Sequence, residues 1–243
     1  MIALPPNSRV LADAEATARA AADHLLDIAG TATGERLAVC LSGGSTPKRL
    51  YQLLAGADYV GRVPWSRIHW FFGDDRVVPW DDASSNVRMV REAFGHEGPV
   101  PAGHFHFIPS DEGAEIGARA YQRTLQDFYG SDTFDPGRPL FDLVLLGLGS
   151  DGHTASLFPS KPALDEHEAW VVPVPEAGME PYVPRISLTF PTLASSRSVL
   201  FLVNGTGKRD PLARLDAGED LPAGRVVSRG VVTWFIDEAA AGA

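Results

Sequence analysis

The stretch that decides the fold is FDLVLLGLGSDGHTASLFP, residues 141–159. Its apolar run at 143–146 is continuous, which is typical of a strand that is buried on both faces. Glycines then break the strand, and Asp151 and His153 follow on either side of a further glycine. Ligands of open α/β sheets bind where the strands end, on loops that the scaffold holds still. We therefore predict a functional turn at this point.

Outside this stretch, apolar runs and helical patterns alternate along the chain. The apolar runs predict strands at 36–41, 68–72, 104–108, 141–147, 169–174, 185–190, 198–203 and 231–236. The helical patterns predict helices at 10–29, 47–56, 84–94, 111–129 and 211–215. This alternation predicts an α/β fold with a mostly parallel sheet and helices on both faces. No repeat, low-complexity segment or long linker interrupts the chain, so we expect residues 1–243 to form a single domain.

Composition narrows the possible partners. The formal net charge of -10 argues against non-specific binding of nucleic acid and against docking on anionic membranes. The lone cysteine, Cys40, allows no internal disulfide and lies in an apolar run, where we expect a core residue. The chain shows no signal-peptide pattern and no apolar run of about 18 residues, so we expect a cytoplasmic protein. An anionic ligand would need a basic island in this acidic chain.

A glycine-rich turn precedes the second predicted helix. Thr46 is a good N-cap and Pro47 suits the first helical position. Such a turn lets backbone N–H groups and the helix dipole approach an anion. It matches neither the Walker motif nor the dinucleotide fingerprint, so an anion site and a plain turn remain equal alternatives. The candidate residues are Ser42, Gly43, Gly44, Ser45 and Thr46.

Charged residues also follow other predicted strands. The sequence GDDR at 73–76 is either a solvated turn with a weak ion pair or a site in which Arg76 grips an anion as a planar fork. In the second case, Asp74 would bind sugar hydroxyls or orient another side chain. Arg185 and Lys208, taken singly, are ordinary surface charges. Together with Arg76 and the glycine-rich turn, they would supply the basic island.

The pair of Asp151 and His153 is the candidate for proton transfer. A histidine can take a proton from water near neutral pH, because its unperturbed pKa is about 6.5. A nearby acid could orient the ring or stabilise its charge. The alternative is a loop histidine without a special role. We assign no chemistry to the other six histidines, and His104 and His106 lack cysteine partners, so we expect no metal site.

Six motifs together resemble the 6-phosphogluconolactonase family, in its order and at its spacing. They are LSGGSTPKRLY (41–51), FFGDDRVVP (71–79), SNVRMV (85–90), LGLGSDGHTASLFP (146–159), RISLTFPTL (185–193) and LVNGTGK (202–208). The resemblance covers most of residues 36–236. It implies a Rossmann-like three-layer α/β/α fold and the cofactor-free hydrolysis of 6-phosphoglucono-1,5-lactone to 6-phosphogluconate in the oxidative pentose phosphate pathway. The implied partner is this sugar phosphate lactone, and the oligomeric state stays open, with a monomer among the alternatives.

The resemblance also implies roles for single residues. His153 matches the general base and Asp151 is its neighbour in the site. The phosphate and sugar contacts fall to Arg76, Arg185, Lys208 and the 42–46 turn, and Asp74 matches as well. Two departures stand out. Asp75 replaces the usual glutamate, and Pro211 follows Lys208 so closely that we expect the helix to begin near Asp210, with Lys208 on the loop.

Two other functions fit parts of this pattern. Glucosamine-6-phosphate deaminase shares the SGGSTP turn, but it carries a glutamate at the place of Phe158 and lacks the arginine seen at Arg76. A sugar-phosphate sensor would carry a DNA-binding segment, for which the first 35 residues leave no room. Both comparisons favour the lactonase. In its mechanism, His153 would activate water, and backbone N–H groups of the 147–152 turn would stabilise the oxyanion.

Overall fold

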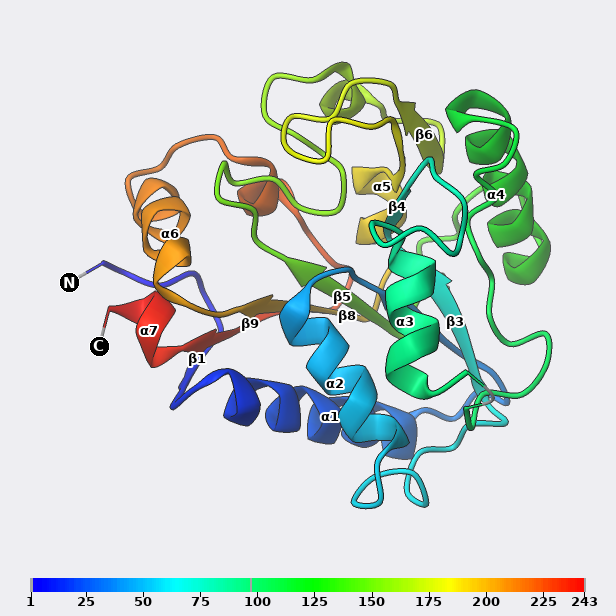
Figure 1. Ribbon diagram of the computed structural model, residues 1–243, viewed down its shortest axis with the longest axis horizontal. Helices are drawn as coiled ribbons and strands as arrows, with labels where there is room; N and C mark the ends of the chain where they lie inside the picture. Colours follow the sequence, from blue (N-terminus) through cyan, green and yellow to red (C-terminus); the bar gives the residue numbers. More distant parts are fainter. Residues whose placement is uncertain (1, 97, 243) are drawn as a thin grey trace.

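The computed structural model describes residues 2–96 and 98–242, and its centre is a parallel sheet (Figure 1). The strand order is β1-β9-β8-β5-β2-β3, and every neighbouring pair is parallel. The strands are β1 Ser8–Leu11, β2 Leu37–Leu41, β3 Ile68–Phe72, β5 Leu143–Gly147, β8 Ser198–Val203 and β9 Val231–Asp237. In Figure 1, α1 and α2 lie below this sheet, and α4 and α5 lie above it. The predicted three-layer α/β fold is confirmed.

The central strands explain the unbroken apolar runs of the sequence. Every residue of β2 and β8 is buried. In β5 the first four residues are buried, and the last, Gly147, is partly exposed. Because both faces of these strands are covered, neither face needs polar side chains. Val144 of β5 pairs with Cys40 on one side and Val199 on the other. Cys40 is fully buried in this core, as the sequence predicts.

A second, antiparallel sheet lies beside the first. It has the order β4-β7-β6, with β4 Asp74–Arg76, β7 Arg185–Leu188 and β6 Val171–Val174. The sequence predicts β6 and β7 as strands but treats 73–76 as a turn. Instead, β4 pairs with β7 so that Arg76 lies directly opposite Arg185. Like charges that lie opposite each other across a strand pair repel each other.

Helices flank both sheets. They are α1 Ala14–Thr31, α2 Ser45–Ala55, α3 Asn86–Phe94, α4 Ala114–Tyr129, α5 Phe190–Ala194, α6 Arg209–Asp216 and α7 Glu238–Ala241, with short 3-10 turns at η1 Pro162–Asp165, η2 Thr206–Lys208 and η3 Pro222–Arg225. The helix predicted at 10–29 begins later, because Asp13 caps α1 and the residues before it form β1. Within the described residues, no helix has both the length and the apolar character to span a membrane.

Three further features differ from the predictions: one strand, one N-cap and one helix start. The strand predicted at 104–108 is wrong, because this segment makes a single bridge, between Phe105 and Trp70. The N-cap of α2 is Gly44, with φ of +108°, and not Thr46. Lys208 ends η2 and α6 begins at the next residue, so Pro211 lies in the first turn of α6. A proline is tolerated there because the N–H groups of a first turn have no helical partner.

Candidate functional site

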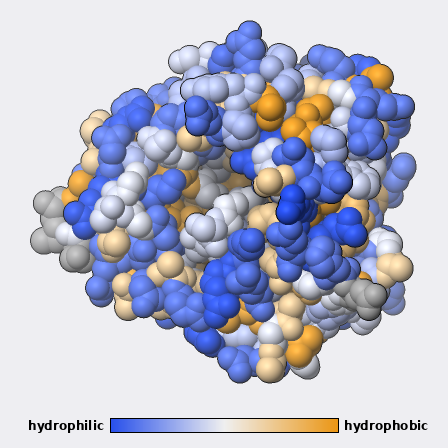
Figure 2. Space-filling view, viewed as in Figure 1, coloured by the Kyte–Doolittle hydropathy of each residue, from blue (hydrophilic) through white to orange (hydrophobic). Residues whose placement is uncertain are grey.

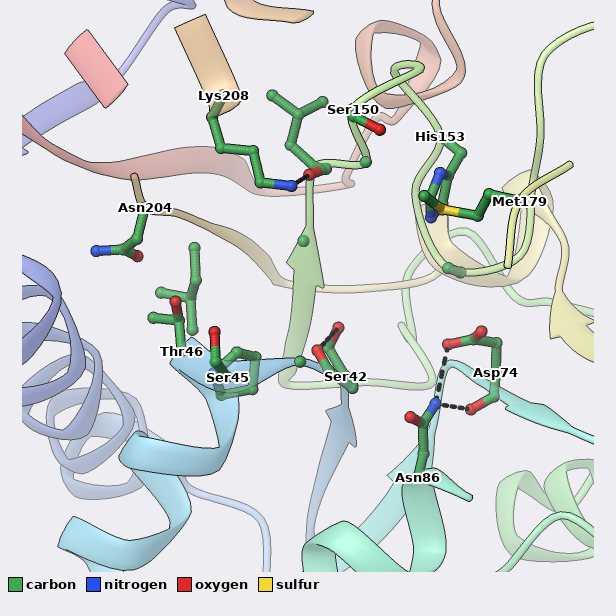
Figure 3. A pocket seen from close by; sticks show the side chains of 18 of the residues that line it. Ser42, Ser45, Thr46, Asp74, Asn86, Ser150, His153, Met179, Asn204 and Lys208 are labelled. Atoms are coloured by element: carbon green, nitrogen blue, oxygen red, sulfur yellow. Dashed lines mark hydrogen bonds between the residues drawn. The ribbon is translucent and has the colours of Figure 1, made fainter. Parts of the chain in front are cut away.

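A pocket of about 290 Å³ opens at the carboxyl edge of the parallel sheet (Figure 3). The visible face of the molecule is hollowed near its centre (Figure 2). Strands β2 and β5 and helix α2 bring their ends to this pocket. Of the residues singled out in the sequence, the structure brings together Ser42, Gly43, Gly44, Ser45, Thr46, Asp74, Arg76, His153, Arg185 and Lys208. Asp151 does not line the pocket but contacts His153 from behind.

His153 is held by the neighbouring acid. Its Nδ1 lies 2.5 Å from Oδ1 of Asp151, and its backbone N–H donates to the same oxygen at 3.1 Å. Because an ionised carboxylate can only accept, Nδ1 carries the proton and Nε2 is left as the basic nitrogen. Partial burial opposes ionisation of Asp151, but the hydrogen bond and charge of His153 outweigh it and lower the pKa of Asp151. The acid therefore stays ionised and fixes the ring.

The backbone beneath His153 explains a glycine of the motif. A Cβ on Gly149 would lie 2.0 Å from Nδ1 of His153, so only glycine lets the ring pack this closely. Gly149 N–H donates to the carbonyl of His153 at 2.8 Å, and Gly152 N–H donates to that of Gly149 at 3.1 Å. These two donors are occupied within the turn. These two N–H groups are therefore not available to an oxyanion, whereas Leu148 and Ser150 of the same turn line the pocket. The prediction that N–H groups of the 147–152 turn stabilise an oxyanion stays a prediction.

The 42–46 turn joins β2 to α2 and faces the pocket. The hydroxyl of Tyr51, in α2, accepts from the N–H of Ser42 at 3.0 Å and donates to its carbonyl at 2.8 Å. Tyr51 is fully buried, so the end of β2 is anchored to the helix that follows it. The first N–H groups of a helix have no carbonyl partner within it, and they favour an anion. The geometry thus supports the anion site over the plain turn.

Three cations face this turn without a carboxylate partner. Within the described residues, the side chains of Arg76, Arg185 and Lys208 donate only to uncharged oxygens. Nη1 of Arg76 donates to the carbonyl of Ser84 at 2.6 Å, and Nζ of Lys208 donates to that of Leu148 at 2.5 Å. Burial lowers the pKa of Lys208, although the nearby Asp151 raises it. The basic island predicted for this acidic chain is present.

Arg185 is the most buried of the three, with 3% of its surface exposed. Its Nη2 donates to the carbonyl of Pro181 at 2.9 Å, while its Nε is buried without a partner. Burial and the charge of Arg76 lower the pKa of Arg185. A buried charge without a counter-charge is costly, so this arrangement is best explained by an anion that binds in the pocket.

The two adjacent acids have different surroundings. Asp74 lines the pocket, and its Oδ2 accepts from the hydroxyl of Ser156 at 2.6 Å. Asp75 is 1% exposed and accepts from the backbone N–H groups of Arg76, at 2.8 Å, and Asn86, at 2.7 Å. Burial raises the pKa of Asp75 to about 6. Asp75 therefore caps α3 and does not reach the pocket, whatever the longer glutamate does in the family.

Sequence reasoning missed several lining residues. Asn86 and Asn204 lie inside quoted motifs, but a neutral amide gives no sign of function from its charge. Nδ2 of Asn204 donates to Asp237 at 3.3 Å, while its Oδ1 is buried without a partner. Met179 and Glu180 come from the loop before β7, where no pattern pointed to the site. The other missed residues are Pro47, Ala155 and Leu202, while Gly147, Leu148, Gly149 and Ser150 belong to the turn that the sequence analysis offered for the oxyanion.

Three other histidines form a stacked cluster near the start of β3. The rings of His69 and His104 are 4.3 Å apart, and Nδ1 of His69 lies 3.0 Å from Nε2 of His106. Burial, followed by the charge of His69, lowers the pKa of His106 to about 4. In the part of the chain that the structure describes, no group of three or more His, Cys, Asp or Glu side chains is arranged to hold a metal ion. The cluster is a packing feature.

Comparisons with known proteins agree with this geometry. The family of glucosamine-6-phosphate isomerases/6-phosphogluconolactonase matches residues 12–234. The 6-phosphogluconolactonase of Nostoc sp. is 38% identical over 239 residues, which cover 95% of each chain. The crystal structure of 6-phosphogluconolactonase from Trypanosoma cruzi is 32% identical and has a TM-score of 0.84, over 99% of this chain and 97% of that one.

A deaminase also shares the fold. The structure of a monomeric glucosamine-6-phosphate deaminase has a TM-score of 0.79 at 19% identity, over 97% of this chain and 99% of that one. At this identity the likeness concerns the fold alone. The family match, by contrast, covers nearly the whole chain, and the Nostoc relative is well above 30% identical. This chain belongs to the family of glucosamine-6-phosphate isomerases and 6-phosphogluconolactonases.

Proposed function

We propose that this chain hydrolyses 6-phosphoglucono-1,5-lactone to 6-phosphogluconate, as part of the oxidative pentose phosphate pathway, with His153 as the general base. One observation carries the proposal. The ring of His153 is held through Nδ1 by Asp151 at 2.5 Å, in a pocket that also holds three cations without carboxylate partners among the described residues. Such a pocket offers a base for water and a place for a phosphate. The name shared by the Nostoc and Trypanosoma cruzi relatives supports the same reaction.

Binding of the phosphate prepares the reaction. The start of α2 and the side chains of Arg76, Arg185 and Lys208 offer N–H groups and positive charge to it. The phosphate does not react, so its binding energy can be used to hold the lactone carbonyl beside His153. Asp74, which faces the same pocket, offers an acceptor for sugar hydroxyls. Holding the reacting atoms together removes much of the entropic cost of the encounter.

His153 then moves a proton twice. Nε2 takes a proton from water, and the hydroxide-like oxygen forms a bond to C1 of the lactone. The negative charge that develops on the carbonyl oxygen meets backbone N–H groups of Leu148 and Ser150, which line the pocket, since those of Gly149 and Gly152 bond within the turn. The bond between C1 and the ring oxygen then breaks. The leaving oxygen takes the proton from Nε2, which restores the base.

The residue at Phe158 supports hydrolysis over deamination. Phe158 is 1% exposed, and its ring centroid lies 4.7 Å from that of His153. The guanidinium of Arg185 lies 5.8 Å from the same ring. An apolar ring therefore occupies the position where the deaminase pattern has a glutamate. With no carboxylate there, the base beside it is suited to activating water.

A coupled assay tests the proposal. Glucose 6-phosphate is oxidised enzymatically in the same vessel to supply the lactone, and its disappearance is followed with and without this protein. We expect hydrolysis well above the spontaneous rate. A parallel assay follows ammonia release from glucosamine 6-phosphate, where we expect none. Tight binding of 6-phosphogluconate without faster hydrolysis would refute the enzyme and favour a sensor.

A further inference from the structure

We propose that Asn86 is a positioning residue, which sets the direction of Arg76 in the pocket. The inference rests on the proposed function for the identity of the ligand. Asn86 is the first residue of α3, and 4% of its surface is exposed. It lines the pocket together with Arg76, at the end of β4, and Gly43, in the turn between β2 and α2. Its amide is neutral, and its part in the site follows from what it connects.

The amide of Asn86 takes part in three hydrogen bonds, of which the longest joins Nδ2 to Oδ1 of Asp74 at 3.5 Å. Its Nδ2 donates to the backbone carbonyl of Asp74 at 2.9 Å (Figure 3). Its Oδ1 accepts from Nη1 of Arg76 at 3.2 Å. A carbonyl can only accept and a guanidinium can only donate, so these partners determine which way the amide faces. Asn86 therefore ties the side chain of Arg76 to the backbone of the strand that carries it.

The same amide also touches the glycine-rich turn. A Cβ on Gly43 would lie 2.2 Å from Oδ1 of Asn86, so the amide packs directly against the turn. The backbone of Asn86 is held in its turn by Asp75, whose Oδ1 accepts its N–H at 2.7 Å. Asn86 thus sets the spacing between Arg76 and the 42–46 turn, the two sides of the pocket that face the anion.

The bonds of Arg76 show what Asn86 controls. The two acceptors of Nη1 are the carbonyl of Ser84 and Oδ1 of Asn86. Within the described residues, Nε and Nη2 make no hydrogen bond to the protein. One nitrogen thus anchors the guanidinium, and Nη2 is left for a ligand. If Asn86 is lost, one acceptor remains for Nη1, and the long side chain regains rotamers that point elsewhere.

A double-mutant cycle tests this. Binding of 6-phosphogluconate is measured by calorimetry for the wild type, Asn86→Ala, Arg76→Ala and the double variant. We expect Asn86→Ala to weaken binding about tenfold and to have little further effect once Arg76 is absent, because contacting residues are coupled. Ser85→Ala is the matched control, since Ser85 bonds Asp75 and caps α3 without touching Arg76. We expect its effect on binding to stay within about twofold.

Each outcome decides the proposal. The proposal is overturned if the losses of affinity in Asn86→Ala and Arg76→Ala multiply in the double variant. It is also overturned if Asn86→Ala binds as well as the wild type, or if Ser85→Ala loses as much affinity as Asn86→Ala. If Asn86→Ala does not fold, Asn86→Asp replaces it. Its carboxylate pairs with Arg76 and repels the carbonyl of Asp74, so weaker binding is again expected, and unchanged binding would refute the inference. A wild type that binds without turnover refutes the proposed function alone, and one that does not bind refutes both.

Discussion

The two edges of the parallel sheet carry two cavities that differ in size and in charge pairing. The cavity at the carboxyl edge has a volume of about 290 Å³ and contains the candidate site. The cavity at the amino edge is larger, at about 770 Å³, and its lining includes His24, Arg36, Phe128, Arg138, Asp142 and Arg197. Volume alone would therefore select the wrong edge.

Buried guanidinium donors without a partner, more than ion pairs, separate the two cavities among the described residues. At the amino edge, Nε of Arg197 lies 3.3 Å from Asp142, and Arg138 donates to the carbonyl of Tyr129 at 2.9 Å. At the carboxyl edge, within the described residues, the arginines have no carboxylate partner and two of their nitrogens are buried without any partner. Polar groups that the protein leaves unsatisfied need a ligand, whereas those already satisfied stabilise the fold. Within the described residues, the buried arginine nitrogens without a partner lie at the carboxyl edge, which supports the candidate site there.

Backbone geometry explains why the edges differ. The carboxyl ends of parallel strands lead into helix N-termini, where N–H groups and the positive end of the dipole attract anions. The amino edge gathers helix C-termini, whose free carbonyls attract cations. Arg67 shows this directly, because its guanidinium donates to the carbonyls of Ala29, Ala32 and Gly34 at the end of α1. Arginine side chains at the amino edge thus bond to carbonyl groups of the protein, whereas those at the carboxyl edge keep donors available for a ligand.

The largest effect is expected at His153. His153→Ala should lower kcat for lactone hydrolysis by about 10²–10⁴-fold, because the base that activates water is lost. The coupled assay measures this, and circular dichroism checks that the variant folds. Near wild-type kcat in a folded variant would contradict the assigned role. His24→Ala, at the amino edge, is the control and should leave kcat unchanged.

The arginines test the comparison itself. Arg185→Ala should raise KM about 10–100-fold, since a charge-assisted contact with the substrate is lost. Arg197→Ala removes an arginine from the amino edge and should leave KM within about twofold, because exposed ion pairs contribute little. Both values come from the same coupled assay. Similar losses from the two variants would mean that charge pairing does not distinguish the edges.

Gly149→Ala should show that the backbone positions His153. The added Cβ would lie 2.0 Å from Nδ1 and push the ring away from Asp151. We expect kcat to fall about tenfold or more, since misplacement of a base is costly, with little change in 6-phosphogluconate binding. Calorimetry and the coupled assay separate the two quantities. The interpretation fails if binding and kcat fall together in a folded variant.

The smallest effect concerns His106, in the cluster near the amino edge. Its folded pKa of about 4 is below the ordinary value of about 6.5, so the folded state binds fewer protons than the unfolded state between these pH values. Stability should therefore rise with pH across this window, and be lowest below it. The charges of His69 and His104 also lower the pKa of His106. The charges of His104 and Arg36 likewise lower the pKa of His69, so both shifts act in the same direction.

His106→Phe removes this titration and keeps the stack on Phe71, whose ring lies 4.3 Å away. We expect the pH dependence of the free energy of unfolding to flatten by about 1 kcal/mol, after allowance for solvent screening of a half-buried group. Urea unfolding at pH 4.5 and pH 7 measures it. An unchanged slope would contradict the assigned pKa. Lactone hydrolysis by this variant should match the wild type.

Much of the fold could be predicted from local patterns. Strands β3 and β8 lie where their apolar runs predict them, because a strand covered on both faces has no polar alternation. The beginning of the chain was harder. The alanine-rich pattern from residue 10 fits a helix, but Val10 and Leu11 pair with β9, a contact distant in sequence. The segment at 104–108 failed for the opposite reason, since its residues suit a strand that finds no continuous partner.

The sequence could predict which charged and glycine residues belong to the candidate site, but not how their atoms are arranged and bonded. Charge and glycine content indicated Arg76, Arg185, Lys208 and the 42–46 turn. They could not indicate Asn86, because an amide acts through its partners. Nor could they show that Gly149 and Gly152 use their N–H groups within the turn. Those properties depend on which atoms meet.

By itself, the sequence determined the parallel α/β core, the basic residues and the glycine-rich turn at strand ends, and the neighbouring acid of His153. These features follow from local rules. An unbroken apolar run, a glycine-rich turn and the two-residue spacing of Asp151 and His153 each lie within a short stretch of sequence. Only the tertiary structure decided that β4 pairs with β7, which sets Arg76 against Arg185, and that Asp75 is a cap while Asp74 faces the pocket. The pairing of β4 with β7 joins residues far apart in the sequence, and the bond between Asp75 and Asn86 spans a loop, so no short local pattern contains either contact.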